Sequence, residues 1–147
     1  AFDGVAACCV LPRNRGVGTV DVVVAAPGGA PDSALLAALS AWFSARREIA
    51  VDVKVLAPQT VTVDLTVQVK PAEGYTLQQA KEQVTAAVNG WFTGQRLGQS
   101  VLLAQLSSLI FACDGVANCK VTAPGADVAV SVRQLPVLGA LTVEELA

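Results

Sequence analysis

The ten residues Val61–Lys70 read VTVDLTVQVK, and this stretch decides the fold class. Apolar and polar side chains alternate at every position, so in an extended chain all the apolar side chains lie on one face. The apolar face consists of Val61, Val63, Leu65, Val67 and Val69. The polar face consists of Thr62, Asp64, Thr66, Gln68 and Lys70. The pattern predicts a β-strand with one buried face and one face in water.

Two other stretches show the same alternation. The first places Val51, Val53 and Val55 against Asp52 and Lys54. The second places Val128, Val130 and Val132 against Asp127, Ser131 and Arg133. Strands with one wet face predict sheets that helices cover on one side only.

Three helices are expected between the strands. The segment Pro31–Arg47 has an apolar stripe at helical spacing, with Pro31 in the first turn. Its stripe consists of Leu35, Leu36, Leu39, Trp42 and Phe43. Thr76–Gln79 reads TLQQ, a capping-box pattern that should open a second helix. The inward residues of that helix are Leu77, Ala80, Val84, Val88 and Trp91. A third, shorter helix is expected over Leu103–Phe111.

The chain repeats some of its phrases. Asp3–Val10 reads DGVAACCV and Asp114–Val121 reads DGVANCKV, with six of the eight positions identical. The TVDV of Thr19–Val22 is likewise echoed by the TVDL of Thr62–Leu65. The second DGVA copy follows the helix expected over Leu103–Phe111, whereas only two residues precede the first copy. We therefore expect the chain to be part of a longer protein made of similar α+β units.

These patterns predict an α+β fold made of tandem two-layer α/β sandwich modules. The modules are expected to be ferredoxin-like, βαβ-type units with mostly antiparallel sheets that helices cover on one face. Residues 1–58 form the first module, truncated at its start. Residues 59–147 form the second module, with residues 134–147 as a C-terminal tail.

Composition excludes several classes of function. The net charge is −2, and the basic residues form no cluster beyond Arg46-Arg47, so nucleic-acid binding is not expected. The longest uncharged run, Leu97–Cys113, is too short and too polar to span a bilayer, so no membrane partner is expected. Apolar residues make up 53% of the chain, which is more than a small monomer easily hides. This excess points to a surface that binds other proteins.

The sequence offers no obvious reactive centre. It contains no histidine, which excludes an ordinary catalytic triad and histidine metal ligands. The four cysteines lack CxxC spacing and are interpreted as small apolar residues in or near a core; these are Cys8, Cys9, Cys113 and Cys119. A Cys8–Cys119 disulfide is conceivable but poorly supported in a cytosolic protein.

The remaining polar and aromatic candidates also have structural interpretations. Asp21 and Asp64 occupy equivalent outward strand positions, where a solvated face explains them. Trp42 and Trp91 lie at helical spacing beside apolar residues and are interpreted as core. We therefore predict no catalytic residue, no cofactor, no metal and no enzymatic activity.

The C-terminal stretch Gln134–Val143, QLPVLGALTV, is apolar and uncharged. As a free tail it would promote aggregation. It either returns to its own sheet as a last strand or adds as an arm to a neighbouring subunit, and the sequence favours neither. The predicted assembly contacts in this tail are Leu135, Val137, Leu138 and Leu141.

The order of these segments resembles the C-terminal part of baseplate J-like proteins, found in Mu-like phages, prophages and related contractile tails. The segments are DGVAACCVLPRNRGVGTVDVVV, VTVDLTVQVKPAEGY, a helix ending in WF, LGQSVLLAQLSSLIFACDGVANCKV and LPVLGALTV. One departure is Arg46–Ile49, where many relatives have Arg-Pro. The resemblance implies a structural component of the virion tail baseplate. Its expected partners are other baseplate proteins and copies of itself, with assembly in the bacterial cytoplasm. No catalytic residues come with this family.

A small-ligand-binding regulatory module is the alternative. Repeated βαβ units can bind metabolites where their sheet edges meet, and Gly28-Gly29 before a helix could hold an anion.

Overall fold

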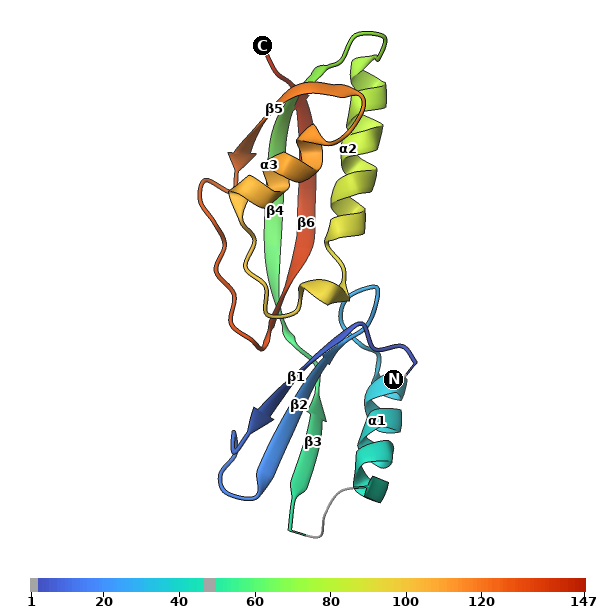
Figure 1. Cartoon of the computed structure of the whole chain (residues 1–147), viewed down its shortest axis with the longest axis vertical. Helices are drawn as coiled ribbons and strands as arrows, with labels where there is room; N and C mark the ends of the chain where they lie inside the picture. The colour runs from blue at the N-terminus through green and yellow to red at the C-terminus, as the bar shows by residue number, and fades with distance from the viewer. Residues whose placement is uncertain (1–2, 47–49) are drawn as a thin grey trace. The chain divides into compact units, whose positions relative to one another are not determined.

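The computed structural model describes residues 3–46 and 50–147, and it is an α+β fold (Figure 1). In chain order the elements are β1 (Ala7–Pro12), β2 (Thr19–Ala25), α1 (Ser33–Arg46), β3 (Asp52–Leu56), β4 (Gln59–Pro71), α2 (Leu77–Trp91), a 3₁₀ turn (Gly94–Arg96), α3 (Leu103–Phe111), β5 (Val116–Ala123) and β6 (Gln134–Glu145). The strands form two three-stranded sheets, with orders β1-β2-β3 and β5-β4-β6.

The chain forms two compact units. The first contains the chain up to Thr60 together with residues 93–99 and 131–135. The second contains Val61–Phe92, Ser100–Val130 and Pro136–Ala147. The first unit thus includes two short segments that the sequence-based boundary at residue 58 leaves in the second module.

Both sheets are mixed rather than mostly antiparallel. β1 and β2 form an antiparallel hairpin, and β2 pairs in parallel with β3. β5 is antiparallel to β4, whereas β6 runs parallel to it: the Ala140 N–H donates to Asp64 Oδ1 and the Leu146 N–H donates to the Val69 carbonyl. A parallel pair requires a crossover connection, which α1 supplies between β2 and β3.

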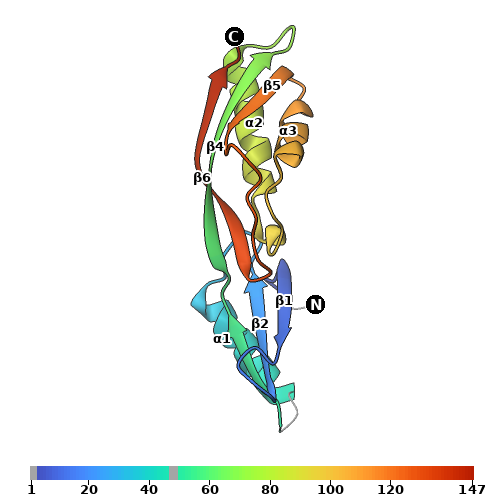
Figure 2. The ribbon, with the colours of Figure 1, turned by 90° about the vertical axis from the view of Figure 1, so that its left-hand side faces the viewer.

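The alternation in β4 is confirmed, and it determines how the second unit packs. Val63, Leu65, Val67 and Val69 are buried, whereas Thr62, Asp64 and Lys70 are exposed. Figure 2 shows α2 and α3 on the same side of this sheet, as expected. The core beneath them is completed by Ala80, Val84, Val88, Val101, Leu106, Ile110 and Val116.

The second helix begins where its capping box predicts. Thr76 Oγ1 accepts from the Gln79 N–H at 3.2 Å, and Gln79 Oε1 accepts from the Thr76 N–H at 2.9 Å. The two side chains therefore satisfy two backbone donors that a helix start leaves without partners. The bounds of α3 are those expected from the sequence.

The first helix differs in two respects from expectation. It begins at Ser33, because the Asp32 carboxylate caps the Leu35 N–H at 2.7 Å, so Pro31 precedes the cap. Leu39 is buried, but Trp42 is 40% exposed, so its interpretation as a core residue was wrong. The Arg46 guanidinium lies over the Trp42 ring, 4.5 Å from its centroid. Arg47 lies outside the described residues.

The strand expected around Val128–Val132 does not form. Val128 makes one isolated bridge with Val101, and Val132 is 54% exposed. The Val130 N–H donates instead to Ser100 Oγ, and the Ser131 N–H donates to Gln134 Oε1. Side-chain oxygens thus accept hydrogen bonds from the backbone N–H groups that a strand would use to pair with its neighbour.

β2, the central strand of the first sheet, is more deeply buried than the sequence predicts. All five residues from Asp21 to Ala25 are buried, so both faces of β2 are covered. Residues 93–99 contribute to this cover, because the Gly94 N–H donates to the Pro27 carbonyl. A Cβ on Gly94 would lie 2.7 Å from the Ala26 carbonyl carbon, so only glycine allows this approach.

The alternation of buried and exposed residues in β6 breaks at Gly139. Leu138 and Leu141 both pack against the core although three positions separate them, and Gly139 and Ala140 between them are exposed. The Asp64 carboxylate reaches across and accepts from the Ala140 N–H at 2.9 Å. A Cβ on Gly139 would clash with Asp64 and would lie 2.6 Å from Thr62 Cγ2. Alanine at this position would therefore force the exposed Asp64 and Thr62 side chains to move.

Replacing Gly139 with alanine should lower the free energy of unfolding by about 1–3 kcal/mol, because the new methyl group displaces the Asp64 carboxylate from the Ala140 N–H. Gly90 in α2 has nothing within 4 Å of an added Cβ, so Gly90→Ala should instead stabilise the protein by about 0.5–1 kcal/mol. Chemical denaturation of both variants checks the pair. Equal stability of the two variants would contradict the steric role of Gly139.

Candidate functional site

The described residues do not gather into a recognisable reactive centre. In residues 3–46 and 50–147, no three histidine, cysteine, aspartate or glutamate side chains lie close enough together to hold a metal ion. Within the same ranges, no helix has the length and apolarity needed to cross a membrane.

All four cysteines are free thiols. Burial raises the pKa of the Cys113 thiol, with a further contribution from the neighbouring Asp114. Burial also raises the pKa of Cys119, whose Sγ lies 3.7 Å from the Ser107 carbonyl of α3. Raised pKa values leave these two thiols protonated near neutral pH, so neither suits the role of a nucleophile.

Asp21 lies in a polar network rather than on a solvated face, which corrects the sequence-based interpretation. Its side chain is 1% exposed. Asn14 Nδ2 donates to one carboxylate oxygen at 2.5 Å, and Arg15 Nε donates to the other at 2.5 Å. Hydrogen bonds from Asn14, and then from Arg15, lower the pKa of Asp21. Asp64, by contrast, is exposed as expected.

This network ties together parts of the first unit that are distant in sequence. The Arg15 guanidinium also donates to Asp52 Oδ2 at 2.6 Å, which fastens the β1–β2 turn to β3. The Arg133 guanidinium donates to Asn14 Oδ1, which fastens residues 131–135 to the same turn. The hydrogen bonds to Asp52 and Asp21 raise the pKa of Arg15. Because each of these charged groups has a partner, the network is well suited to holding the turn and poorly suited to acid–base chemistry.

The two glycines considered for an anion site form a turn instead. The Gly29 N–H donates to the Ala26 carbonyl at 2.9 Å. The following helix start is already capped by the Asp32 carboxylate, whose negative charge would repel a bound anion. This geometry argues against the small-ligand alternative at Gly28-Gly29.

The tail residues that were predicted as assembly contacts lie in β6, the strand next to β4. Leu135 has no exposed surface, so in this fold its side chain is buried in its own chain. Leu138 and Leu141 are half-buried against the core of the second unit. Val137 is also half-buried, but it is not among the side chains packed against that core. Of the two alternatives left open, the structure shows the tail in its own sheet.

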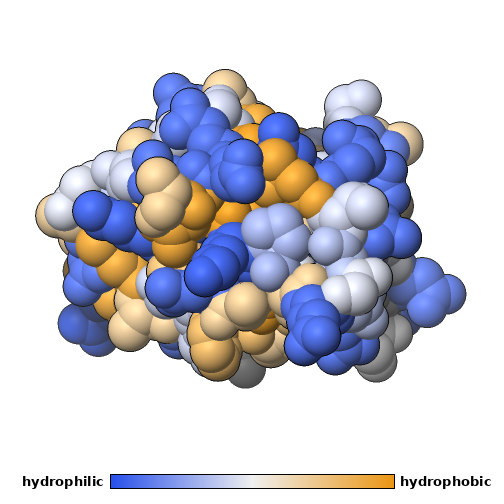
Figure 3. All heavy atoms as spheres, turned by 90° about the horizontal axis from the view of Figure 1, so that it is seen from above, coloured by the Kyte–Doolittle hydropathy of each residue, from blue (hydrophilic) through white to orange (hydrophobic). Residues whose placement is uncertain are grey.

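Several large apolar side chains are exposed. Figure 3 shows hydrophobic residues reaching the surface between hydrophilic ones. In the described ranges the exposed large apolar residues are Val10, Val17, Trp42, Tyr75, Leu102, Phe111 and Val132.

A pocket of about 380 Å³ opens between α1 and the first sheet, and Trp42 lies in its wall. Its lining residues are Val5, Cys8, Val22, Val24, Leu39, Trp42 and Phe43.

Replacing Asp21 with asparagine should lower the melting temperature at pH 7. The melting temperature of the variant should also fall less than that of the wild type as the pH is lowered. Because the folded state depresses the pKa of Asp21, the carboxylate stabilises the fold above its unfolded pKa of about 3.9. That stabilisation is lost as the pH falls through the lower, folded pKa. Thermal melts between pH about 7 and about 2 should show a smaller loss for Asp21→Asn than for the wild type.

Glu73 is exposed, and Glu73→Gln provides a control for the loss of one negative charge: it should leave the melting temperature at pH 7 unchanged. If the melting temperatures of the wild type and Asp21→Asn fell by the same amount in acid, the Asp21 carboxylate would not stabilise the fold.

Comparison with known proteins agrees with the resemblance noted in the sequence. No curated protein matches the chain. The family model of the baseplate J-like protein C-terminal domain matches residues 63–144, which is more than half of the chain. The match begins within β4 and ends within β6, so it includes β5, most of β4 and β6, and both helices that cover the sheet. The chain therefore belongs to the family of the baseplate J-like protein C-terminal domain, a structural domain of the phage tail baseplate.

Proposed function

We propose that this protein is a structural component of the contractile-tail baseplate of a Mu-like phage or prophage, acting through protein–protein assembly and not through catalysis. The observation that carries the proposal is the family match over residues 63–144. The partners are other baseplate proteins and further copies of this chain. The protein assembles in the bacterial cytoplasm and remains in the virion tail baseplate.

The geometry of β6 supports a contact surface in the second unit. β6 ends the strand order β5-β4-β6, and in the described part of the chain no further strand pairs with its outer edge. An edge strand exposes backbone donors and acceptors that a strand of another protein can pair with. Val137, Leu138 and Leu141 would form the apolar contacts of such a pairing. Leu135, which is fully buried, would anchor the start of the strand.

Protein–protein assembly is also consistent with the chemistry of the polar groups. The buried carboxylate of Asp21 is engaged in holding a turn, and the Cys113 and Cys119 thiols have raised pKa values. These groups support rigidity and packing, which are the properties that an assembly subunit needs.

Replacing Val137 with aspartate should prevent incorporation into baseplates, because a carboxylate would be desolvated in the proposed contact. Complementation of a deletion strain with Val137→Asp should reduce intact tails at least about tenfold, and electron microscopy of the particles would measure this. Val132→Asp provides the control, since Val132 is exposed and lies outside β6. Intact tails in the deletion strain itself would overturn the baseplate role, and normal incorporation of Val137→Asp would exclude the β6 contact.

A further inference from the structure

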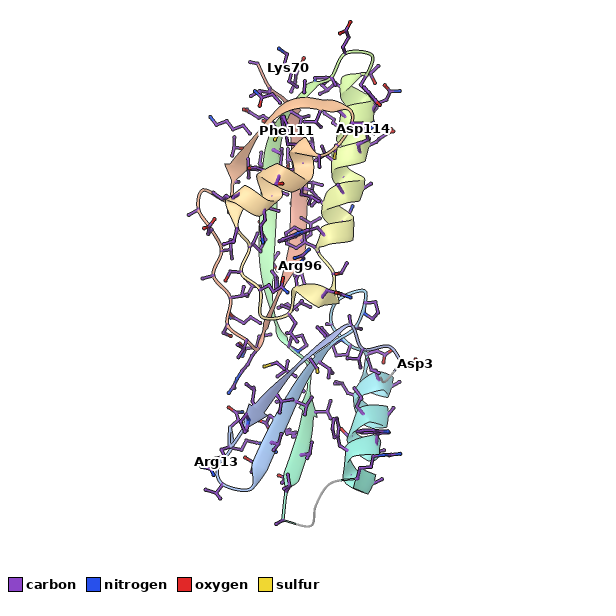
Figure 4. The ribbon with its side chains drawn as sticks, in the orientation of Figure 1. Asp3, Arg13, Lys70, Arg96, Phe111 and Asp114 are labelled. Carbon is purple, nitrogen blue, oxygen red and sulfur yellow. The ribbon has the colours of Figure 1, made fainter. Side chains whose placement is uncertain are left out.

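The two DGVA copies form equivalent strands in the two sheets. Figure 4 labels Asp3 and Asp114, the first residue of each copy. The first copy runs into β1, antiparallel to β2, and the second runs into β5, antiparallel to β4. Cys8 lies opposite Val24 in the first pair, and Cys119 lies opposite Val69 in the second. The repeat aligns Val24 with Val67, so the two pairings differ in register by two residues. A shift of two leaves Cys8 and Cys119 on equivalent faces of their sheets.

The second unit shows what covers this strand when the unit is complete. α3 lies across β5, and the Cys119 Sγ contacts the Ser107 carbonyl in the middle of that helix at 3.7 Å. Leu106 and Ile110 of α3 are fully buried in the core of the second unit. Val121, two residues after Cys119, is also packed against that core.

The corresponding face of the first unit is open. Cys8, the counterpart of Cys119, is exposed, and Val10, the counterpart of Val121, is 57% exposed. The 380 Å³ pocket lies on this face, between Cys8 of β1 and the α1 residues Leu39 and Trp42. The first unit therefore has an apolar hollow next to the strand that α3 covers in the second unit.

We propose that this hollow and the adjoining face of β1 form a docking groove for an amphipathic helix of the α3 type. The helix belongs to a partner polypeptide and presents apolar residues at positions i, i+3 and i+7, the spacing of Leu103, Leu106 and Ile110 in α3. Its apolar side chains fill the pocket, and its backbone passes over Cys8 as α3 passes over Cys119.

The charge beside the groove makes the partner more specific. The Arg46 guanidinium lies over the Trp42 ring, and Trp42 lines the pocket. Both salt bridges found in the described ranges involve Arg15, so Arg46 forms no ion pair there. A helix that carries carboxylates beside its apolar face complements this positive rim. The inference rests on the repeat and on the pocket, and it holds whatever assembly the protein joins.

A labelled peptide tests the groove. The probe has the sequence of residues 101–112 between flanking glutamates, is held helical by a side-chain bridge, and is titrated with the whole protein by fluorescence anisotropy. We expect saturable binding that Val10→Asp weakens at least about tenfold, because a carboxylate replaces an apolar contact. Val17→Asp is the matched control: Val17 is 90% exposed and lies outside the pocket lining, so binding should be unchanged.

Two further peptides test the pattern and the charge. A peptide of the same composition that lacks the i, i+3, i+7 spacing should not bind. Replacing the flanking glutamates with lysines should weaken binding about fivefold, and Arg46→Gln should abolish this difference. Bound peptide should also protect Cys8 from alkylation. Failure of the helical peptide to bind, or equal binding to Val10→Asp and Val17→Asp, would overturn the proposal.

Discussion

The burial of one face of β4 beneath α2 and α3 is the constraint on which the second unit depends. Three side chains on this face, Leu65, Val67 and Val69, have no exposed surface. Each contributes about 1.5–3 kcal/mol relative to an exposed position. A shift of one residue in the register of this strand would turn all of them toward water, so the hydrophobic pattern fixes its pairing. With β4 fixed, β5 and β6 take their positions on its two edges.

Features encoded by neighbouring residues could be predicted from the sequence. Three features depend only on side chains that are close together in the sequence. They are the alternation of β4, the capping box at Thr76 and the bounds of α3. The burial of Asp21 could not be predicted in this way, because Asn14 and Arg15 become its partners only when the hairpin closes. A carboxylate in an alternating strand is typical of a solvated face until such partners are known.

Alternation by itself was also a weak guide to strands. The valines of residues 128–132 alternate as cleanly as those of β3, yet side-chain acceptors at Ser100 and Gln134 take the backbone donors there. In β6 a spacing of three between Leu138 and Leu141 is a visible break in the period, and it coincides with the hydrogen bond from the Ala140 N–H to Asp64 Oδ1. As for the open face in the first unit, the repeat reveals equivalent strands, but the exposure of Val10 appears only in the structure.

The way the chain is divided between its two units determines how they are connected. The chain passes from one unit to the other five times, after Thr60, Phe92, Gln99, Val130 and Leu135. Several covalent crossings rather than one linker therefore connect the units, and a single backbone cut leaves the other crossings intact. Neither unit is a continuous segment that can be removed by truncation. The two units are therefore connected through several segments of the same chain.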